Sequence, residues 1–240
     1  MKAGVPQGSI LSPLLFNIFM NDFPSTISNC TVFQYADDTI LLSRSVGYKK
    51  AMNNLQRNVD KAMQWYSQKW YCRKRTKNKT GLLQKPFKDN SSWYSTFLHP
   101  HDCVSCHCSP VEYVNSIKYL GVLFDSDLSW QSHLAYVCNR LRSAACLLFN
   151  IKSMVPVAIK KNNCPGLAYS ILRYGITVFA SCGIRWQNRV DNLLKNILKS
   201  VAYNSSLLTG DNIFHDVSLP SFRSLFEQTV VTRQFWNPEF

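Results

Sequence analysis

Two adjacent aspartates, Asp37 and Asp38, lie in the middle of the apolar, β-prone segment FQYADDTILL, residues 33–42. Each carboxylate raises the cost of ionising the other, because two charges about 4 Å apart repel by roughly 1 kcal/mol in water. A divalent cation would turn this repulsion into attraction, since Mg²⁺ prefers one or two carboxylates together with phosphate oxygens. The pair therefore predicts a metal site, and a solvated Asp-Asp turn is the alternative interpretation.

The residues around the pair predict a β-hairpin with the two aspartates at its tip. Val32, Phe33 and Tyr35 precede the pair, and Ile40-Leu41-Leu42 follows it, so both flanks are apolar and β-prone. At a hairpin tip the regular alternation of side chains breaks down, and both carboxylates can face the same space.

A helix is predicted on each side of this hairpin. In the segment before it, Ser12 is a good N-cap, Pro13 suits the first helical position, and residues 22–24 should stop the helix. After the hairpin, apolar residues at steps of three and four predict a second amphipathic helix over residues 51–66.

The second half of the chain has its own pattern of strand and helix. SIKYLGVLFD, residues 116–125, reads as a strand that ends in a turn. Residues 133–151 and 190–201 carry apolar side chains at helical spacing, and Pro165-Gly166 is expected to break this helical half.

The charge of the chain favours a polyanionic partner. Its formal net charge is +13, from 27 Lys and Arg against 14 Asp and Glu. This balance points to nucleic acid first and to an acidic membrane surface second. Residues 61–88 carry nine of the basic residues and no acidic one. They predict a phosphate-facing surface, with a solvated basic face as the alternative.

The nine cysteines are read as reduced intracellular thiols, since their number is odd and a secretory signal is disfavoured by Pro13 inside the first apolar run. The segment HPHDCVSCHC, residues 99–108, crowds His101, Cys103, Cys106, His107 and Cys108 together. A structural zinc usually needs two separated ligand pairs, so a loop with free thiols is preferred over a zinc site. A membrane span is not expected, because no stretch approaches the roughly 20 apolar residues that it needs.

The segment VPQGSILSPLLFNIFMNDFP followed by YADD resembles the reverse transcriptases of non-LTR retrotransposons, in particular the jockey-like arthropod type. IKYLGVLFDSDLSWQSHL is similar to the primer grip and the start of the thumb of that family, and YSILRYGITVFASC to a later thumb helix. Together these segments cover most of residues 4–202.

This resemblance implies an α+β fold, with a partial polymerase palm of a helix plus an antiparallel hairpin, followed by a mainly helical thumb. The expected parts are a palm over residues 1–90, a loop and primer-grip-like strand over 91–125, and a helical thumb or connection over 126–240. The implied partners are an RNA template and a DNA primer, and the implied location is the nucleus. The oligomeric state is not predicted.

The resemblance also implies roles for single residues. Asp37 and Asp38 would be the catalytic ligands of two Mg²⁺ ions. The nucleotide and template would be contacted by Pro6, Gln7, Gly8, Ser9, Tyr35 and Lys79, and the primer by Tyr119, Leu120 and Gly121. For Lys79, the alternatives Lys77 and Arg75 stay open.

One departure from the family bears directly on activity. The first catalytic aspartate of the family lies on a strand well before VPQGS, where this chain has only a few residues. We therefore expect an N-terminally truncated RNA-directed DNA polymerase that binds Mg²⁺ weakly and is inactive alone. The alternative hypothesis is a nucleic-acid-binding remnant without chemistry.

Overall fold

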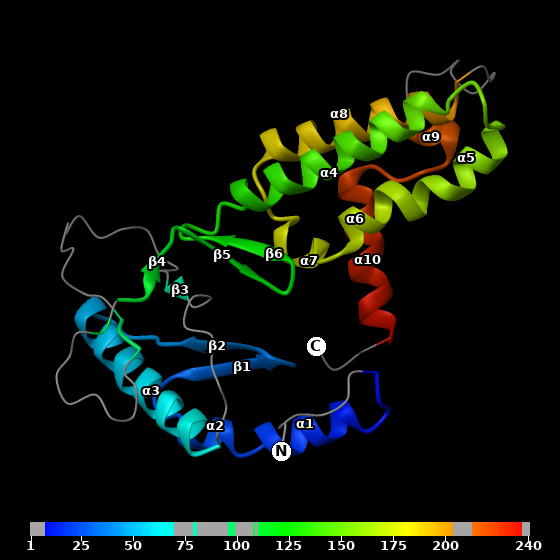
Figure 1. The fold of residues 1–240 in the computed structure, drawn as a ribbon. Helices are drawn as coiled ribbons and strands as arrows, with labels where there is room; N and C mark the ends of the chain where they lie inside the picture. The colour runs from blue at the N-terminus through cyan, green and yellow to red at the C-terminus, as the bar shows by residue number, and fades with distance from the viewer. Residues whose placement is uncertain are drawn as a thin grey trace. The chain divides into compact units, whose positions relative to one another are not determined.

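The computed structural model describes residues 8–69, 79–80, 96–98, 108, 110–203 and 213–236. The chain forms two compact units, Met1–Leu120 and Gly121–Phe240, and each unit is considered by itself (Figure 1). Helices together with short antiparallel hairpins make up the described part, so the α+β prediction is confirmed. Within these described ranges, no helix is both long enough and apolar enough to cross a bilayer.

In its described residues, the N-terminal unit has three helices and several short strands. Its helices are α1 (Ser12–Met20), α2 (Phe23–Thr26) and α3 (Tyr48–Gln68), and its strands are β1 (Thr31–Tyr35), β2 (Asp38–Leu42), β3 (Lys79–Thr80), β4 (Glu112–Tyr113) and β5 (Ser116–Tyr119). β1 and β2 form an antiparallel pair, whereas β3 and β4 are parallel. The predicted hairpin and both predicted helices are therefore present.

A small apolar core joins the three helices to one face of the hairpin. Its buried members are Met20, Phe23, Ala62 and Trp65, and Val32 and Leu41 of the hairpin pack against them. Ala62 and Trp65 lie three residues apart on α3, on the face that amphipathic spacing predicts to be buried. The hairpin therefore rests on α3 through one of its two faces.

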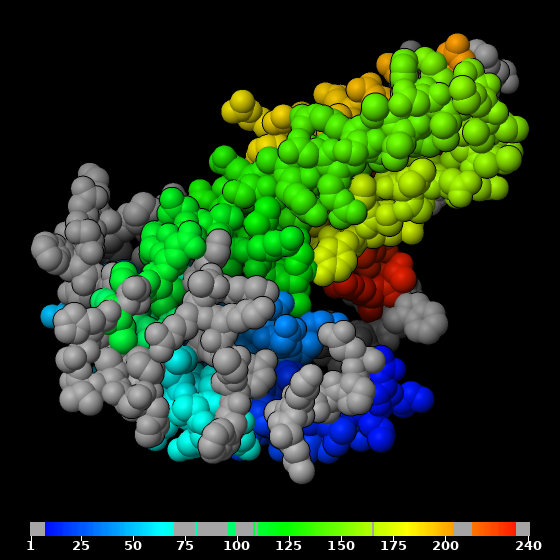
Figure 2. Space-filling view, viewed as in Figure 1, coloured from blue at the N-terminus to red at the C-terminus, as the bar shows by residue number. Residues whose placement is uncertain are grey.

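The C-terminal unit begins with a strand and continues as helices. Its elements are β6 (Val122–Asp125), α4 (Gln131–Asn150), α5 (Val157–Cys164), a π-helical turn (Pro165–Tyr169), α6 (Ser170–Arg173), α7 (Ile176–Phe179), α8 (Ile184–Val201), α9 (Ile213–Val217) and α10 (Phe222–Trp236). α4 and α8 lie side by side (Figure 1). Their fully buried side chains include Leu134 and Leu141 of α4 and Leu194 and Ile197 of α8. The helices of this unit present a closely packed surface on the face seen in Figure 2.

Three local expectations differ from the structure. Ser12 is the first residue of α1 rather than its N-cap, which is Leu11. The segment 116–125 is two strands, β5 and β6, because the chain turns at Leu120-Gly121, where both residues have positive φ. Pro165 does not break the helical run, because a π-helical turn, Pro165–Tyr169, connects α5 directly to α6. Proline lacks the N–H that an α-helical turn would need at this position, and a wider turn is compatible with its absence.

Candidate active site

The aspartate pair lies at the tip of the β1–β2 hairpin. Tyr35 pairs with Asp38 at the end of the ladder, so Ala36 and Asp37 form a two-residue turn. Ala36 has φ of +50°, a left-handed conformation that is uncommon for a residue with a Cβ atom. Asp37 and Asp38 are both exposed. The tip thus presents two adjacent carboxylates to solvent.

The hairpin has one covered face and one open face. Val32 and Leu41 are cross-strand partners on the covered face, which packs on the core. Because side chains alternate along a strand, Phe33, Tyr35 and Asp38 belong to the opposite, open face. There Phe33 is 47% and Tyr35 65% exposed, although both are large and apolar or aromatic. Asp38 therefore lies at the edge of an exposed aromatic surface.

The chemistry of the pair fits a hard divalent cation. Exposed carboxylate oxygens are the ligands that Mg²⁺ accepts together with phosphate oxygens and water. Two carboxylates alone make an open site that leaves most coordination positions to water or to a substrate. Over the described ranges, no cluster of three or more His, Cys, Asp and Glu side chains is placed to hold a metal ion.

Gly8 and Ser9 form the turn that leads into α1. Gly8 has φ of +83°, and no atom lies within 4 Å of the position that a Cβ would take, so the backbone conformation is what favours glycine here. The hydroxyl Oγ of Ser9 accepts the N–H of Leu11 at 3.3 Å, and the carbonyl of Ser9 accepts the N–H of Ser12 at 3.2 Å. Pro6 and Gln7 lie outside the described residues.

The candidate primer-grip residues lie at the turn between β5 and β6. Tyr119 ends β5, and Leu120 and Gly121 have φ of +45° and +81°. A Cβ atom on Gly121 would meet Tyr174 Cε1 at 3.2 Å. The sequence placed these three residues on one strand, but two of them form the turn instead.

Other predicted residues fall largely outside the described part of the chain. Lys79 begins β3 and pairs with Glu112 of β4, while its side chain is not described. Lys77, Arg75 and most of the basic segment 61–88 are also outside, as is the cysteine and histidine cluster except Cys108. Their roles stay predictions.

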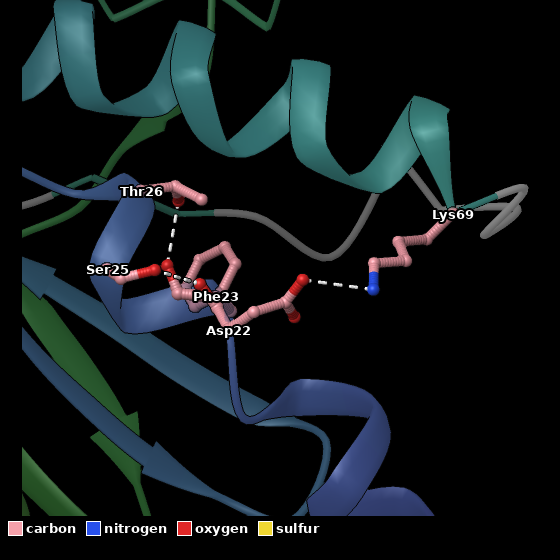
Figure 3. A network of polar contacts seen from close by, with 5 residues as sticks. All are labelled: Asp22, Phe23, Ser25, Thr26 and Lys69. Atoms are coloured by element: carbon pink, nitrogen blue, oxygen red, sulfur yellow. Dashed lines mark hydrogen bonds and ion pairs between the residues drawn. The ribbon is translucent and has the colours of Figure 1, made fainter.

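An ion pair that the sequence did not indicate joins the N-cap residue of α2 to the C-cap residue of α3 (Figure 3). Lys69 Nζ lies 3.0 Å from Asp22 Oδ2, and within 5.4 to 5.7 Å of the ring centroids of Trp65 and Phe19. The hydrogen bond from Lys69 lowers the pKa of Asp22 below its usual value. Ser25 and Thr26 donate their hydroxyls to the carbonyls of Asp22 and Phe23, both at 2.7 Å, which closes the α2 turn.

Two polar side chains attach β6 to α4, and sequence reasoning missed both. Asp125 Oδ2 accepts the N–H of Ser132 at 3.1 Å in the first turn of α4, and the Ser129 hydroxyl at 3.4 Å. His133 is 2% exposed, and its Nδ1 accepts the N–H of Leu123 at 3.4 Å. Asp125 lies five residues before Trp130, the N-cap residue of α4, so the usual capping pattern, with the acceptor on the N-cap residue itself, does not identify it.

Comparison with known proteins identifies relatives of this chain. Residues 1–124, just over half of the chain, match the family described as reverse transcriptase (RNA-dependent DNA polymerase). The RNA-directed DNA polymerase from mobile element jockey of Drosophila melanogaster is 23% identical over 232 residues, which cover 92% of this chain and 24% of that protein. The jockey protein of Drosophila funebris is 28% identical over 191 residues, covering 73% and 20%.

A third relative is the probable RNA-directed DNA polymerase from transposon BS of Drosophila melanogaster, 25% identical over 236 residues, covering 91% of this chain and 24% of that protein. The chain thus spans about a quarter of the length of these curated relatives. No solved structure matches it.

Proposed function

Because this chain belongs to the reverse transcriptase family of RNA-dependent DNA polymerases, we propose that its β1–β2 hairpin carries catalytic carboxylates for nucleotidyl transfer onto a primer. The observation that carries this proposal is the exposed pair Asp37 and Asp38 at the hairpin tip. The function is that of a retrotransposon RNA-directed DNA polymerase, of which this chain supplies a part.

In this proposal, Asp37 and Asp38 hold divalent cations, and Mg²⁺ is the ion that carboxylate oxygens and nucleotide phosphates select together. Cations bound there would activate the primer 3′-hydroxyl and stabilise the leaving pyrophosphate. The role of the two aspartates is to offer negative oxygens at a fixed place. The two-residue turn limits how far Asp37 can move relative to the strands.

The other predicted residues would contact the nucleic acid and the incoming nucleotide. The family implies a nucleic-acid partner, and we assign it as an RNA template with a DNA primer. Pro6, Gln7, Gly8, Ser9, Tyr35 and Lys79 would contact the template and the incoming nucleotide. Tyr119, Leu120 and Gly121 would contact the primer. Residues 1–90 would then form the palm part and residues 126–240 the thumb, and the site of action would be the nucleus.

The proposal is tested in a chimaera, with residues 1–124 of this chain replacing the matching segment of the Drosophila melanogaster jockey polymerase. The chimaera should extend a DNA primer on an RNA template in Mg²⁺. Asp37→Asn should lower extension by about a hundredfold or more, because a neutral amide holds a cation far less well than a carboxylate. Asp22→Asn is the matched control, since Asp22 is paired with Lys69 and should leave extension largely intact.

The outcomes distinguish the two functions that the sequence predicts, nucleotidyl transfer and nucleic-acid binding without chemistry. Extension that survives Asp37→Asn would overturn the assigned chemistry. A folded chimaera that binds the primer–template duplex but does not extend it would support the rival function, nucleic-acid binding without chemistry. Circular dichroism of each variant checks that its fold is retained.

A further inference from the structure

The β1–β2 hairpin depends on other elements for its orientation. Among the described residues, β1 and β2 pair with each other alone, and an isolated two-stranded hairpin is marginally stable in water. Its covered face rests on the core through Val32 and Leu41. Apolar contacts are not directional, so they leave the angle between the hairpin and α3 weakly determined.

A single buried side chain of α3 binds the chain just before the hairpin, at Ser28, three residues before β1 begins. Asn58 is 2% exposed, its Nδ2 donates to the carbonyl of Ser28 at 2.7 Å, and its Oδ1 accepts the N–H of Ser28 at 2.9 Å. Both backbone polar groups of Ser28 are therefore satisfied by one carboxamide, as a neighbouring strand would satisfy them. Nδ2 also lies 2.7 Å from the carbonyl of Asn54 and 3.2 Å from Cys30 Sγ.

The chain directly after the hairpin is attached to the same face of the same helix. Ser43, directly after β2, donates its hydroxyl to the carbonyl of Ala51 at 2.8 Å. Ala51, Asn54 and Asn58 follow one another at steps of three and four, so they lie along one side of α3. The chain shortly before β1 and directly after β2 is thus hydrogen-bonded to one side of α3, beyond the end of the hairpin opposite the aspartates.

A small rotation at the attached end of the hairpin produces a larger displacement at the tip that carries Asp37 and Asp38. Each strand has five residues, so the tip lies roughly 17 Å from the attached end. A rotation of only a few degrees at the attached end would move the tip by about 1 Å at this length. Displacements of that size can lower a reaction rate by about a hundredfold.

The choice of a polar side chain at the buried position 58 indicates a role in fixing the arrangement of its neighbours. A buried amide is unfavourable unless its hydrogen bonds are made, and an apolar side chain would fill a buried helix position without that condition. Asn58 meets the condition only while Ser28 and Asn54 keep their present positions. Such a satisfied polar group specifies one arrangement of its neighbours, which packing alone does not do.

We propose that Asn58 is a positioning residue. Its two hydrogen bonds to the backbone of Ser28 hold the hairpin at the angle that places Asp37 and Asp38 for cation binding. This inference rests on the proposed function. Asn58 does not touch the cation or the nucleotide and acts only through the hairpin.

The test uses the full chain and the substitution Asn58→Asp, which keeps the size of the side chain but removes both donated hydrogen atoms. The new carboxylate would face the carbonyls of Ser28 and Asn54. Asn53→Asp is the matched control, because Asn53 lies on α3 as well and is exposed. Three quantities are measured: the hydrogen exchange rate of the β1–β2 amides, and, by calorimetry, the dissociation constant and the number of the Mn²⁺ sites. Asp37→Asn identifies the site.

For Asn58→Asp we expect the hairpin amides to exchange at least tenfold faster while the amides of α4 and α8 keep their protection. The dissociation constant for Mn²⁺ should rise at least fivefold, and Asn53→Asp should change neither quantity. A purely structural role would lower the number of competent sites through unfolding and leave their dissociation constant unchanged. That result, or unchanged exchange of the hairpin amides, would overturn the positioning role.

The test also separates this inference from the proposed function. If the wild-type chain and Asp37→Asn give identical Mn²⁺ isotherms, the cation site is wrong and the positioning role falls with it. If the isotherms differ but Asn58→Asp binds Mn²⁺ like the wild type, only the positioning role is overturned.

Discussion

Gly121 lies directly against the phenol ring of Tyr174, so that a Cβ atom on this glycine would come within 3.2 Å of Tyr174 Cε1. The backbone of Gly121 is also left-handed, with φ of +81°. Both features belong to the turn where the primer-grip prediction falls. A side chain at position 121 is therefore unfavourable for two reasons, the contact with the ring of Tyr174 and the strain of the left-handed backbone.

Gly121→Ala should lower the free energy of unfolding by about 1 to 2 kcal/mol, chiefly because alanine is strained in the left-handed region. Denaturant unfolding of the full chain measures this. Gly166→Ala is the control, since no atom lies within 4 Å of its Cβ position, and it should be neutral or slightly stabilising. If Tyr174→Ala in the same chain restored the lost stability, contact with the ring rather than backbone strain would be the cause.

Asp125→Ala should destabilise the chain by about 1 to 3 kcal/mol, because it leaves the partly buried N–H of Ser132 without its acceptor. Asp125→Asn keeps an acceptor oxygen and should cost less. The control is Asp127→Ala in the same loop, whose carboxylate accepts the N–H of Ser129 at an exposed position. Thermal unfolding compares the three variants, and equal losses for Asp125→Ala and Asp127→Ala would contradict the capping role.

His133 should make stability depend on pH below neutrality. Burial lowers the pKa of His133 below 6.5, although the nearby Asp125 carboxylate opposes this shift. The unfolded chain therefore binds the proton more readily, and the free energy of unfolding should fall as pH drops from 6.5 toward the folded pKa.

His133→Gln removes this proton linkage, so urea unfolding at pH 7.5 and pH 5.0 should differ less for the variant than for the wild type. At pH 7.5 the variant should lose about 1 kcal/mol, because the amide oxygen of glutamine lies one bond further from the backbone than Nδ1 and does not replace it as the acceptor for the N–H of Leu123. His215→Gln, at an exposed histidine, controls for the substitution itself. An unchanged difference between the two pH values would show that another group is responsible.

Lys160→Met should destabilise the C-terminal unit by about 1 to 3 kcal/mol. The Nζ of Lys160 donates to the carbonyl of Lys152 at 2.7 Å and to that of Ser200 at 3.4 Å, and the side chain is buried. Methionine keeps the length and apolar stem of the side chain but leaves both carbonyls without this donor. Lys161→Met is the matched control, and denaturant unfolding of both variants gives the comparison. Equal stabilities would mean that the hydrogen bonds of Lys160 contribute nothing net.

The sequence alone determined the elements whose evidence is local. The hairpin around Asp37 and Asp38 was predictable because its flanks are β-prone and turn-forming residues stand between them, all within ten residues. The helices now seen at Tyr48–Gln68, Gln131–Asn150 and Ile184–Val201 were predictable from apolar spacing, since one helical face must be buried. The motifs around these elements also sufficed to suggest the family that the comparison then identified.

Only the tertiary structure decided which polar side chains hold these elements in place. Asn58 and Ser28 are 30 residues apart, and Lys160 and Ser200 are 40 apart, so no local pattern could pair them. The contact of Gly121 with the ring of Tyr174 likewise joins residues more than 50 positions apart, and no local pattern indicates it. Local patterns report which face of an element is buried, but a hydrogen-bond partner depends on the path of the whole chain, because only folding brings such residues within hydrogen-bonding distance of one another.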